Sequence, residues 1–170
     1  IDGATTIQVR LHTGDEFPAS LIGTDEQTDL AIIKIKQNGL SPAVLADAST
    51  IVVGEPVVAI GNPLGTLGGT VTEGIISAKD REIVIGGEGM SLLQTSAAIN
   101  PGNSGGGLFD AEGRLVGVVN AKSSGEEIEG IGFAIPVDTV KVVATDLIDH
   151  GYVAGRPVLG AGLVDVDSME

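Results

Sequence analysis

The sequence predicts an all-β protein, a barrel or sandwich of about eight short strands with one helix near the C-terminal end. Three observations support this fold class. Short apolar runs alternate with turn residues along most of the chain. Glycine accounts for 26 of the 170 residues, about twice its usual share, which indicates many tight turns. Apolar residues at helical spacing occur in one segment, and the length suffices for one substantial domain.

The first strands form a predicted hairpin. Residues 5–11 alternate apolar and polar side chains, as a half-buried strand does. A turn at 12–15 and a second strand at 17–23 complete the hairpin. The polar loop 24–29 then leads into a buried strand at 30–36.

The later strands are short. Gly54 and Pro56 interrupt the strand at 52–60, which indicates a bulge or an edge. Residues 61–65 have the composition of a turn. Further strands are expected at 71–78, 82–85, 108–109, 115–120 and 130–136.

The predicted helix begins at residues 136–138. Its apolar residues recur at helical spacing, and His150 and Gly151 suit a helix C-terminus. Residues 155–157 resemble a linker, and a new strand is expected at 158–166. We therefore place one domain at 1–154 and a linker with the first strand of another at 155–170.

Composition excludes several classes of function. The net charge is −14, and nine Lys and Arg residues provide no basic face for nucleic acid. The absence of cysteine excludes disulfides, thiolate metal sites and a cysteine nucleophile. The sequence contains no apolar run of membrane-spanning length, no metal-ligand cluster and no phosphate-binding loop. We expect no cofactor, no metal and no nucleic-acid partner.

Ser104 lies in a loop that suits acyl-transfer chemistry. Gly102, Gly105, Gly106 and Gly107 allow positive φ angles or close backbone approach. Such a loop can direct N–H groups inward, as an oxyanion hole requires. The alternative is a structural glycine-rich turn between two strands.

A serine nucleophile also needs a base and an orienting acid. Asp29 is the best candidate acid, because it lies between Thr28 and a buried strand, where an unpaired carboxylate would be costly. A structural turn cap is the alternative. His12 is expected to be exposed on a hairpin turn, and His150 is explained by the helix C-terminus. Neither histidine has the context of a base.

Four segments resemble the HtrA (DegP/DegS-like) family of trypsin-fold serine proteases. They are 28–31, 61–65, 95–106 and 132–136, in the family's order and spacing. The resemblance runs from Ile1 to about Arg156 and implies two β-barrels with the active site between them, the first barrel being incomplete here. Residues 158–164 resemble the start of the PDZ domain that follows in this family.

The resemblance implies a role for each matching residue. Ser104 corresponds to the nucleophile and Asp29 to the acid that orients the catalytic histidine. The N–H groups of Gly102 and Ser104 would form the oxyanion hole, and Asn103 would shape the turn between them. The strand at 130–135 would border a pocket for small aliphatic P1 residues, with substrate-binding positions at Ile131, Gly132 and Ala134.

Two departures from the family pattern stand out. The catalytic histidine is expected about two residues before Ile1. The chain alone should therefore have almost no proteolytic activity. Ser96 stands where many family members have Asp, and we expect only a modest effect on the geometry of the Ser104 loop.

The resemblance also implies a biological setting. The parent would degrade unfolded or damaged polypeptides outside the cytoplasm, in the periplasm or at the surface of a bacterium. It would form a homo-oligomer, a trimer in this family, and a membrane-anchored parent is compatible with the pattern. The alternative is a non-catalytic pseudoprotease that binds peptides in its cleft or along a sheet edge.

Overall fold

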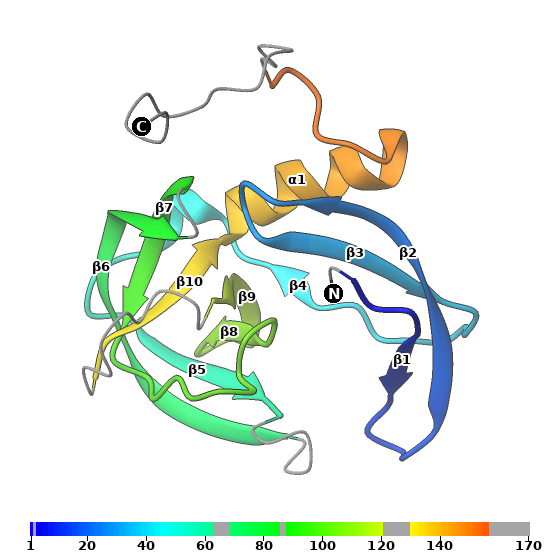
Figure 1. Cartoon of the computed structure of the whole chain (residues 1–170). Helices are drawn as coiled ribbons and strands as arrows, with labels where there is room; N and C mark the ends of the chain where they lie inside the picture. Colours follow the sequence, from blue (N-terminus) through cyan, green and yellow to red (C-terminus); the bar gives the residue numbers. More distant parts are fainter. Residues whose placement is uncertain (2, 63–68, 86–87, 121–129, 157–170) are drawn as a thin grey trace, which may run out of the picture.

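A computed structural model describes residues 1, 3–62, 69–85, 88–120 and 130–156. Within these ranges two β-sheets lie side by side, and one helix crosses above both (Figure 1). This arrangement confirms the predicted all-β fold with a C-terminal helix. The strand expected at 158–166 and most of the turn expected at 61–65 lie outside the described residues.

The first sheet has three antiparallel strands in the order β1-β2-β3 and does not close on itself. The predicted hairpin is confirmed, because Ile7 pairs with Ala19 and Arg10 with Glu16. A register shift between Leu21 and Gly23 bends the middle strand. The strands are β1 (Ile7–Arg10), β2 (Glu16–Asp25) and β3 (Leu30–Ile35).

The second sheet is larger, and six of its strands form a ring of antiparallel pairings. The ring is irregular, because β9 and β10 pair over a short stretch and β6 is interrupted by register shifts. The ring strands are β5 (Pro56–Gly61), β6 (Thr70–Ile85), β7 (Glu88–Thr95), β8 (Gly107–Asp110), β9 (Arg114–Val119) and β10 (Gly132–Pro136). A short strand, β4 (Val44–Leu45), pairs parallel to β9, and the 3-10 helix η1 (Ala48–Thr50) follows it.

The structure corrects three strand predictions. The strands expected at 71–78 and 82–85 are one strand, β6, which bends near Asp80, where φ is +53°. Strand β7 was missed, because glycines at its start break the apolar pattern. Strand β5 begins at Pro56, since Gly54 has a φ of +91° and turns the chain before the strand.

The main core lies inside the ring of strands. As the composition predicts, Val, Ile, Leu and Ala form it, and no aromatic side chain is among its buried members. These members are Ile51, Val57, Ala59, Ile76, Leu93, Ala97, Leu108, Val116, Val119, Ala134 and Val137. The interior of the ring is therefore filled by packed side chains. A packed core of this kind gives the surface loops a rigid support.

Helix α1 (Val137–His150) connects the two sheets. It packs against β2 and β3 of the first sheet and against β9 and β10 of the second (Figure 1). Gly151 ends the helix as predicted, with a φ of +80° and an N–H that donates to the carbonyl of Leu147 at 3.0 Å. None of the described helices has the length and apolar character needed to cross a membrane.

Candidate active site

The loop that carries Ser104 joins β7 to β8 and has a well-defined backbone. The N–H of Asn103 donates to the carbonyl of Asn100 at 2.9 Å, and the N–H of Gly106 donates to the carbonyl of Asn103 at 2.9 Å. The Asn103 carbonyl and the Ser104 N–H belong to one planar trans peptide, so they point in opposite directions. The bond from Gly106 therefore fixes the direction of the Ser104 N–H, one of the two predicted oxyanion donors.

The same loop is attached to the end of β9. The N–H of Gly105 donates to the carbonyl of Val119 at 2.9 Å, and the Val119 N–H donates to the carbonyl of Gly106 at 2.8 Å. Gly105 adopts a φ of +80°, which glycine tolerates best. Ser104 itself is exposed, as a nucleophile that meets a polymer must be.

Asn103 is buried beneath the loop, with 1% of its surface exposed. Its side-chain amide Nδ2 donates to the carbonyl of Ala98 at 3.3 Å, which connects the middle of the loop to its start. The N–H of Asn62, next to the end of β5, donates to the carbonyl of Gly102 at 3.2 Å. The predicted role of Asn103 in shaping the turn is thus consistent with its contacts.

Asp29 ends the turn between β2 and β3, and its φ of +55° is uncommon for a residue with a side chain. The prediction that Asp29 is buried is wrong, because Asp29 is exposed. The buried acid of this turn is Asp25, at 8% exposure. Asp25 accepts hydrogen bonds from the backbone and hydroxyl of Thr28 and from both terminal nitrogens of Arg156.

Asn120 connects the Asp29 turn to the Ser104 loop. Its side-chain Nδ2 donates to Oδ2 of Asp29 at 3.5 Å, and its backbone N–H donates to the carbonyl of Phe133 at 2.9 Å. Asn120 is 2% exposed and directly follows Val119, to which the Ser104 loop is attached. The sequence analysis did not single out Asn120, although a polar residue directly after an apolar strand could have indicated it.

The two histidines of the chain lie in a turn and at the end of a helix. His12 lies in the exposed turn between β1 and β2, as predicted. His150 lies at the end of α1, with Nδ1 4.0 Å from Oδ1 of Asp146 and its ring 5.9 Å from that of Tyr152. The described residues that match the predicted site are therefore a serine, an acid and backbone N–H donors, and both histidines lie where the sequence predicts them.

The comparisons with known proteins agree with this geometry. Residues 1–118 match the family described as "Trypsin-like peptidase domain". The chain belongs to this trypsin-like peptidase family. The HtrA resemblance is confirmed by relatives such as "Serine protease Do-like HtrA" of Bacillus subtilis (strain 168), which is 41% identical over 175 residues. That alignment covers 99% of this chain and 39% of the relative.

A second relative and a solved structure support the same family. "Probable periplasmic serine endoprotease DegP-like" of Chlamydia pneumoniae is 43% identical over 169 residues, covering 99% of this chain and 34% of the relative. The structure titled "HtrA-type protease AlgW with decapeptide" superposes with a TM-score of 0.81 at 46% identity, covering 89% of this chain and 47% of that one. The chain thus spans well under half the length of the Bacillus subtilis and Chlamydia pneumoniae relatives.

Within this trypsin-like domain, the three predicted substrate-binding residues have different surroundings. Ile131 precedes β10 and is 41% exposed. Gly132 is buried, and a Cβ there would overlap Cγ1 of Ile99. Ala134 is fully buried in the core. The assignment of all three as substrate-binding residues stays a prediction.

Ser96 provides a hydrogen-bond acceptor without a charge. Its hydroxyl oxygen accepts from the N–H of Ile75 at 3.1 Å, and the buried Thr95 next to it donates to the carbonyl of the same residue at 2.8 Å. A carboxylate oxygen at position 96 could accept a similar bond. The Ser96 hydroxyl thus attaches this end of β7 to β6, and the modest effect expected of Ser at this position stays a prediction.

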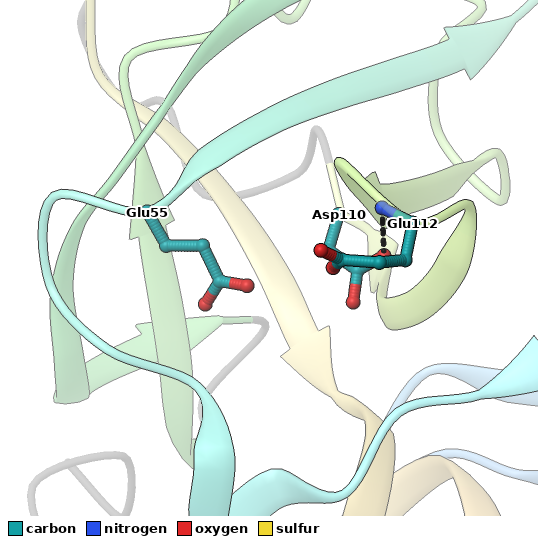
Figure 2. Close-up of side chains that lie close together, drawn as sticks. All are labelled: Glu55, Asp110 and Glu112. Carbon is teal, nitrogen blue, oxygen red and sulfur yellow. Dashed lines mark hydrogen bonds between the residues drawn. The ribbon is translucent and has the colours of Figure 1, made fainter.

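Three carboxylates form an acidic cluster where β5 begins and β8 turns into β9. Figure 2 shows Glu55, Asp110 and Glu112, whose oxygens lie within 4.8 Å of one another. Burial raises the pKa of Asp110, but hydrogen bonds from the backbone and guanidinium of Arg114, together with its charge, outweigh this and hold the pKa below its ordinary value. Glu112 also binds Arg114, at 2.8 Å, and Glu55 accepts from the N–H of Val52 at 3.2 Å. These contacts explain Asp110 and Glu112 as a network around Arg114, whereas Glu55 is bound to the backbone of Val52.

Proposed function

We propose that this chain is the catalytic part of a serine endopeptidase of the HtrA type, with Ser104 as nucleophile and Asp29 as the acid that orients the base. One observation carries the proposal. The end of β9 holds the Ser104 loop through Val119 and holds Asp29 through Asn120, so two segments far apart in sequence meet at one place. The HtrA-type relatives support the same assignment.

The proposed reaction follows the acyl-enzyme route. The hydroxyl oxygen of Ser104 bonds to the carbonyl carbon of the scissile peptide, and its proton passes to a histidine. The N–H groups of Gly102 and Ser104 donate to the oxyanion. The carbon–nitrogen bond then breaks, and the leaving amine takes the proton from the histidine. Water attacks the acyl-enzyme in the same way and releases the acid and free Ser104.

We place the histidine in the residues that precede Ile1 in the longer protein. His12 and His150 lie on an exposed turn and at a helix end, and Asp29 is exposed, so it is accessible to a side chain from a further segment. The 170-residue chain alone should retain little activity, because the oxyanion hole without the base gives only a small part of the full rate.

The substrate, assembly and location of the longer protein are parts of the same proposal. Its substrates would be unfolded or damaged polypeptides, with small aliphatic residues at P1 next to Ile131, Gly132 and Ala134. The relative named as periplasmic supports action outside the cytoplasm. A PDZ domain from residue 155 onward and a trimeric assembly stay predictions from the family resemblance.

Hydrolysis of casein tests the proposed function. Three proteins are compared: the 170-residue chain, the chain extended by the residues encoded before Ile1, and the extended chain with Ser104→Ala. We expect hydrolysis by the extended chain, a loss of at least about a thousandfold in the Ser104→Ala variant and a similarly low rate for the short chain. An extended chain that binds casein without cleaving it would favour the pseudoprotease alternative.

A further inference from the structure

The end of β5 lies directly under the Ser104 loop at Gly61. A Cβ atom at position 61 would overlap Oδ1 of Asn103 and would lie 2.8 Å from its Cα and 2.9 Å from its Cγ. Real Cβ atoms essentially never show contacts this short, and one of the three atoms belongs to the backbone. Any side chain at position 61 would therefore displace the backbone of the residue next to Ser104.

The backbone of Gly61 does not itself need glycine. Gly61 pairs with Thr70 in the β5–β6 ladder, and it is not among the glycines with positive φ. Its conformation is one that any residue adopts in a strand. The requirement for glycine at this position is thus a requirement for space under Asn103.

The Asn103 side chain is held against Gly61 largely by close packing. Its Oδ1 is buried and has no hydrogen-bond partner among the described residues, while Nδ2 binds the carbonyl of Ala98. A buried polar atom without a partner is uncommon in native structures and calls for a reason. The close fit onto Gly61 provides that reason, because rotating the side chain to satisfy Oδ1 would break the bond to Ala98 and vacate the space above Gly61.

Two further contacts extend this support along the loop. The N–H of Asn62 donates to the carbonyl of Gly102, and a Cβ on Gly106 would overlap the carbonyl oxygen of Ile60. The end of β5 therefore touches the residues on both sides of Ser104. Because Gly106 also fixes the Asn103 carbonyl, these contacts together set the direction of the Ser104 N–H.

We propose that Gly61 is a positioning residue for acyl transfer at Ser104. It acts through Asn103, whose close approach to Gly61 holds the peptide that supplies the Ser104 N–H to the oxyanion. This inference rests on the proposed function for its kinetic consequence, whereas the effect of Gly61 on the loop backbone does not depend on that function.

The test uses the extended chain and a matched pair of variants, Gly61→Ala and Gly89→Ala. Gly89 is also a strand glycine, but a Cβ there would meet nothing within 4 Å. For Gly61→Ala we expect kcat to fall by about a hundredfold, with KM within about twofold, since loss of one oxyanion donor has an effect of this size. We expect the amides of residues 102–106 to exchange hydrogen at least tenfold faster in Gly61→Ala, and Gly89→Ala to match the parent in both measurements.

A second variant keeps the test decisive if Gly61→Ala folds poorly. Asn103→Ala leaves Gly61 unchanged but removes the side chain that rests on it, and the same fall in kcat and faster exchange at 102–106 are expected. The proposal would be overturned if Gly61→Ala had the parent's kcat and the parent's rate of amide hydrogen exchange at 102–106. If Gly61→Ala does not fold, the same result in Asn103→Ala would overturn it. If the parent is inactive, the proposed function fails, and amide exchange in the same variants still decides whether Gly61 positions the loop.

Discussion

Asp110 shows how one arginine stabilises a buried charge. Its side chain is 1% exposed, yet it accepts hydrogen bonds from the N–H of Glu112 at 3.0 Å, from the N–H of Arg114 at 2.8 Å and from Nε of Arg114 at 2.7 Å. A buried carboxylate stays ionised when such bonds and an opposite charge favour the charged form. The pKa of Asp110 is therefore lowered in the folded state in spite of its burial.

The variant Arg114→Gln should lower the free energy of unfolding in a pH-dependent way. We expect a measurable loss at pH 7, because Asp110 loses the charge and the hydrogen bond of the guanidinium. A carboxyl with a lowered folded pKa contributes stability above its ordinary pKa of 3.8 and loses it as pH falls through the folded pKa. The difference between parent and variant should therefore shrink below about pH 4 in urea titrations.

Arg81→Gln is the control for this prediction. Arg81 donates through Nε to the neutral amide oxygen of Gln94 at 3.1 Å on an exposed part of β6. Its substitution should change stability by less than about 0.5 kcal/mol, with little dependence on pH from 3 to 7. An Arg114→Gln difference that stays constant down to pH 2 would contradict the assigned role of the ion pair.

Among the elements, helix α1 has the clearest division between a buried and an exposed face. Leu147 is fully buried next to Gly23 of β2, whereas its neighbour Ile148 is 62% exposed. Gly23 allows the close approach, because a Cβ there would lie 3.0 Å from the carbonyl oxygen of Gly151 and 3.1 Å from Cδ2 of Leu147. The helix is thus fitted tightly to the bend in β2.

Leu147→Ala and Ile148→Ala form a matched pair on this helix. We expect Leu147→Ala to lower the free energy of unfolding by about 3 kcal/mol, because it leaves a cavity between helix and sheets. Ile148→Ala should change it by less than about 0.5 kcal/mol. Urea denaturation followed by circular dichroism measures both, and equal losses would show that the helix does not pack as described.

Elements defined by local patterns were predictable from the sequence, and those shaped by distant contacts were not. The β1–β2 hairpin and α1 follow from alternation, helical spacing and the glycine at position 151. The continuity of β6 could not be predicted, because its register shifts near Ala78 depend on the pairing with β7. Strand β7 has 8 residues and begins among glycines, so its pairing partners rather than its composition define it.

At the scale of the whole molecule, the segment after α1 is attached to the first sheet by an ion pair. Arg156 reaches Asp25 with two hydrogen bonds of 2.5 and 2.7 Å, and Asp25 in turn holds Thr28, the neighbour of Asp29. Asp25 and Arg156, which are 131 positions apart in the sequence, are joined in this way. Sequence motifs single out Ser104, Asp29 and the loop glycines as site candidates, and these assignments stay predictions. The contacts of Asn120 and Arg156 could not be predicted, because their partners are distant along the chain.

Arg156→Gln should destabilise the protein through this contact. We expect a loss of about 2–3 kcal/mol in the free energy of unfolding, because the buried Asp25 loses its counter-charge. Arg10→Gln is the control, since Arg10 and Glu16 form a pair that is exposed on both sides. That variant should lose less than about 1 kcal/mol. Similar losses for both variants in urea titrations would mean that the Arg156–Asp25 pair contributes no more to the free energy of unfolding than an exposed ion pair does.

We propose that Ser104 is a nucleophile and that its activation needs the histidine expected in the residues before Ile1. Covalent labelling by a fluorophosphonate, mapped by mass spectrometry, measures this most directly. The extended chain should form one adduct on Ser104, the 170-residue chain should react at least about a hundredfold more slowly, and Ser104→Ala should not react. Labelling of another residue, or equal rates for the short and extended chains, would contradict the claim.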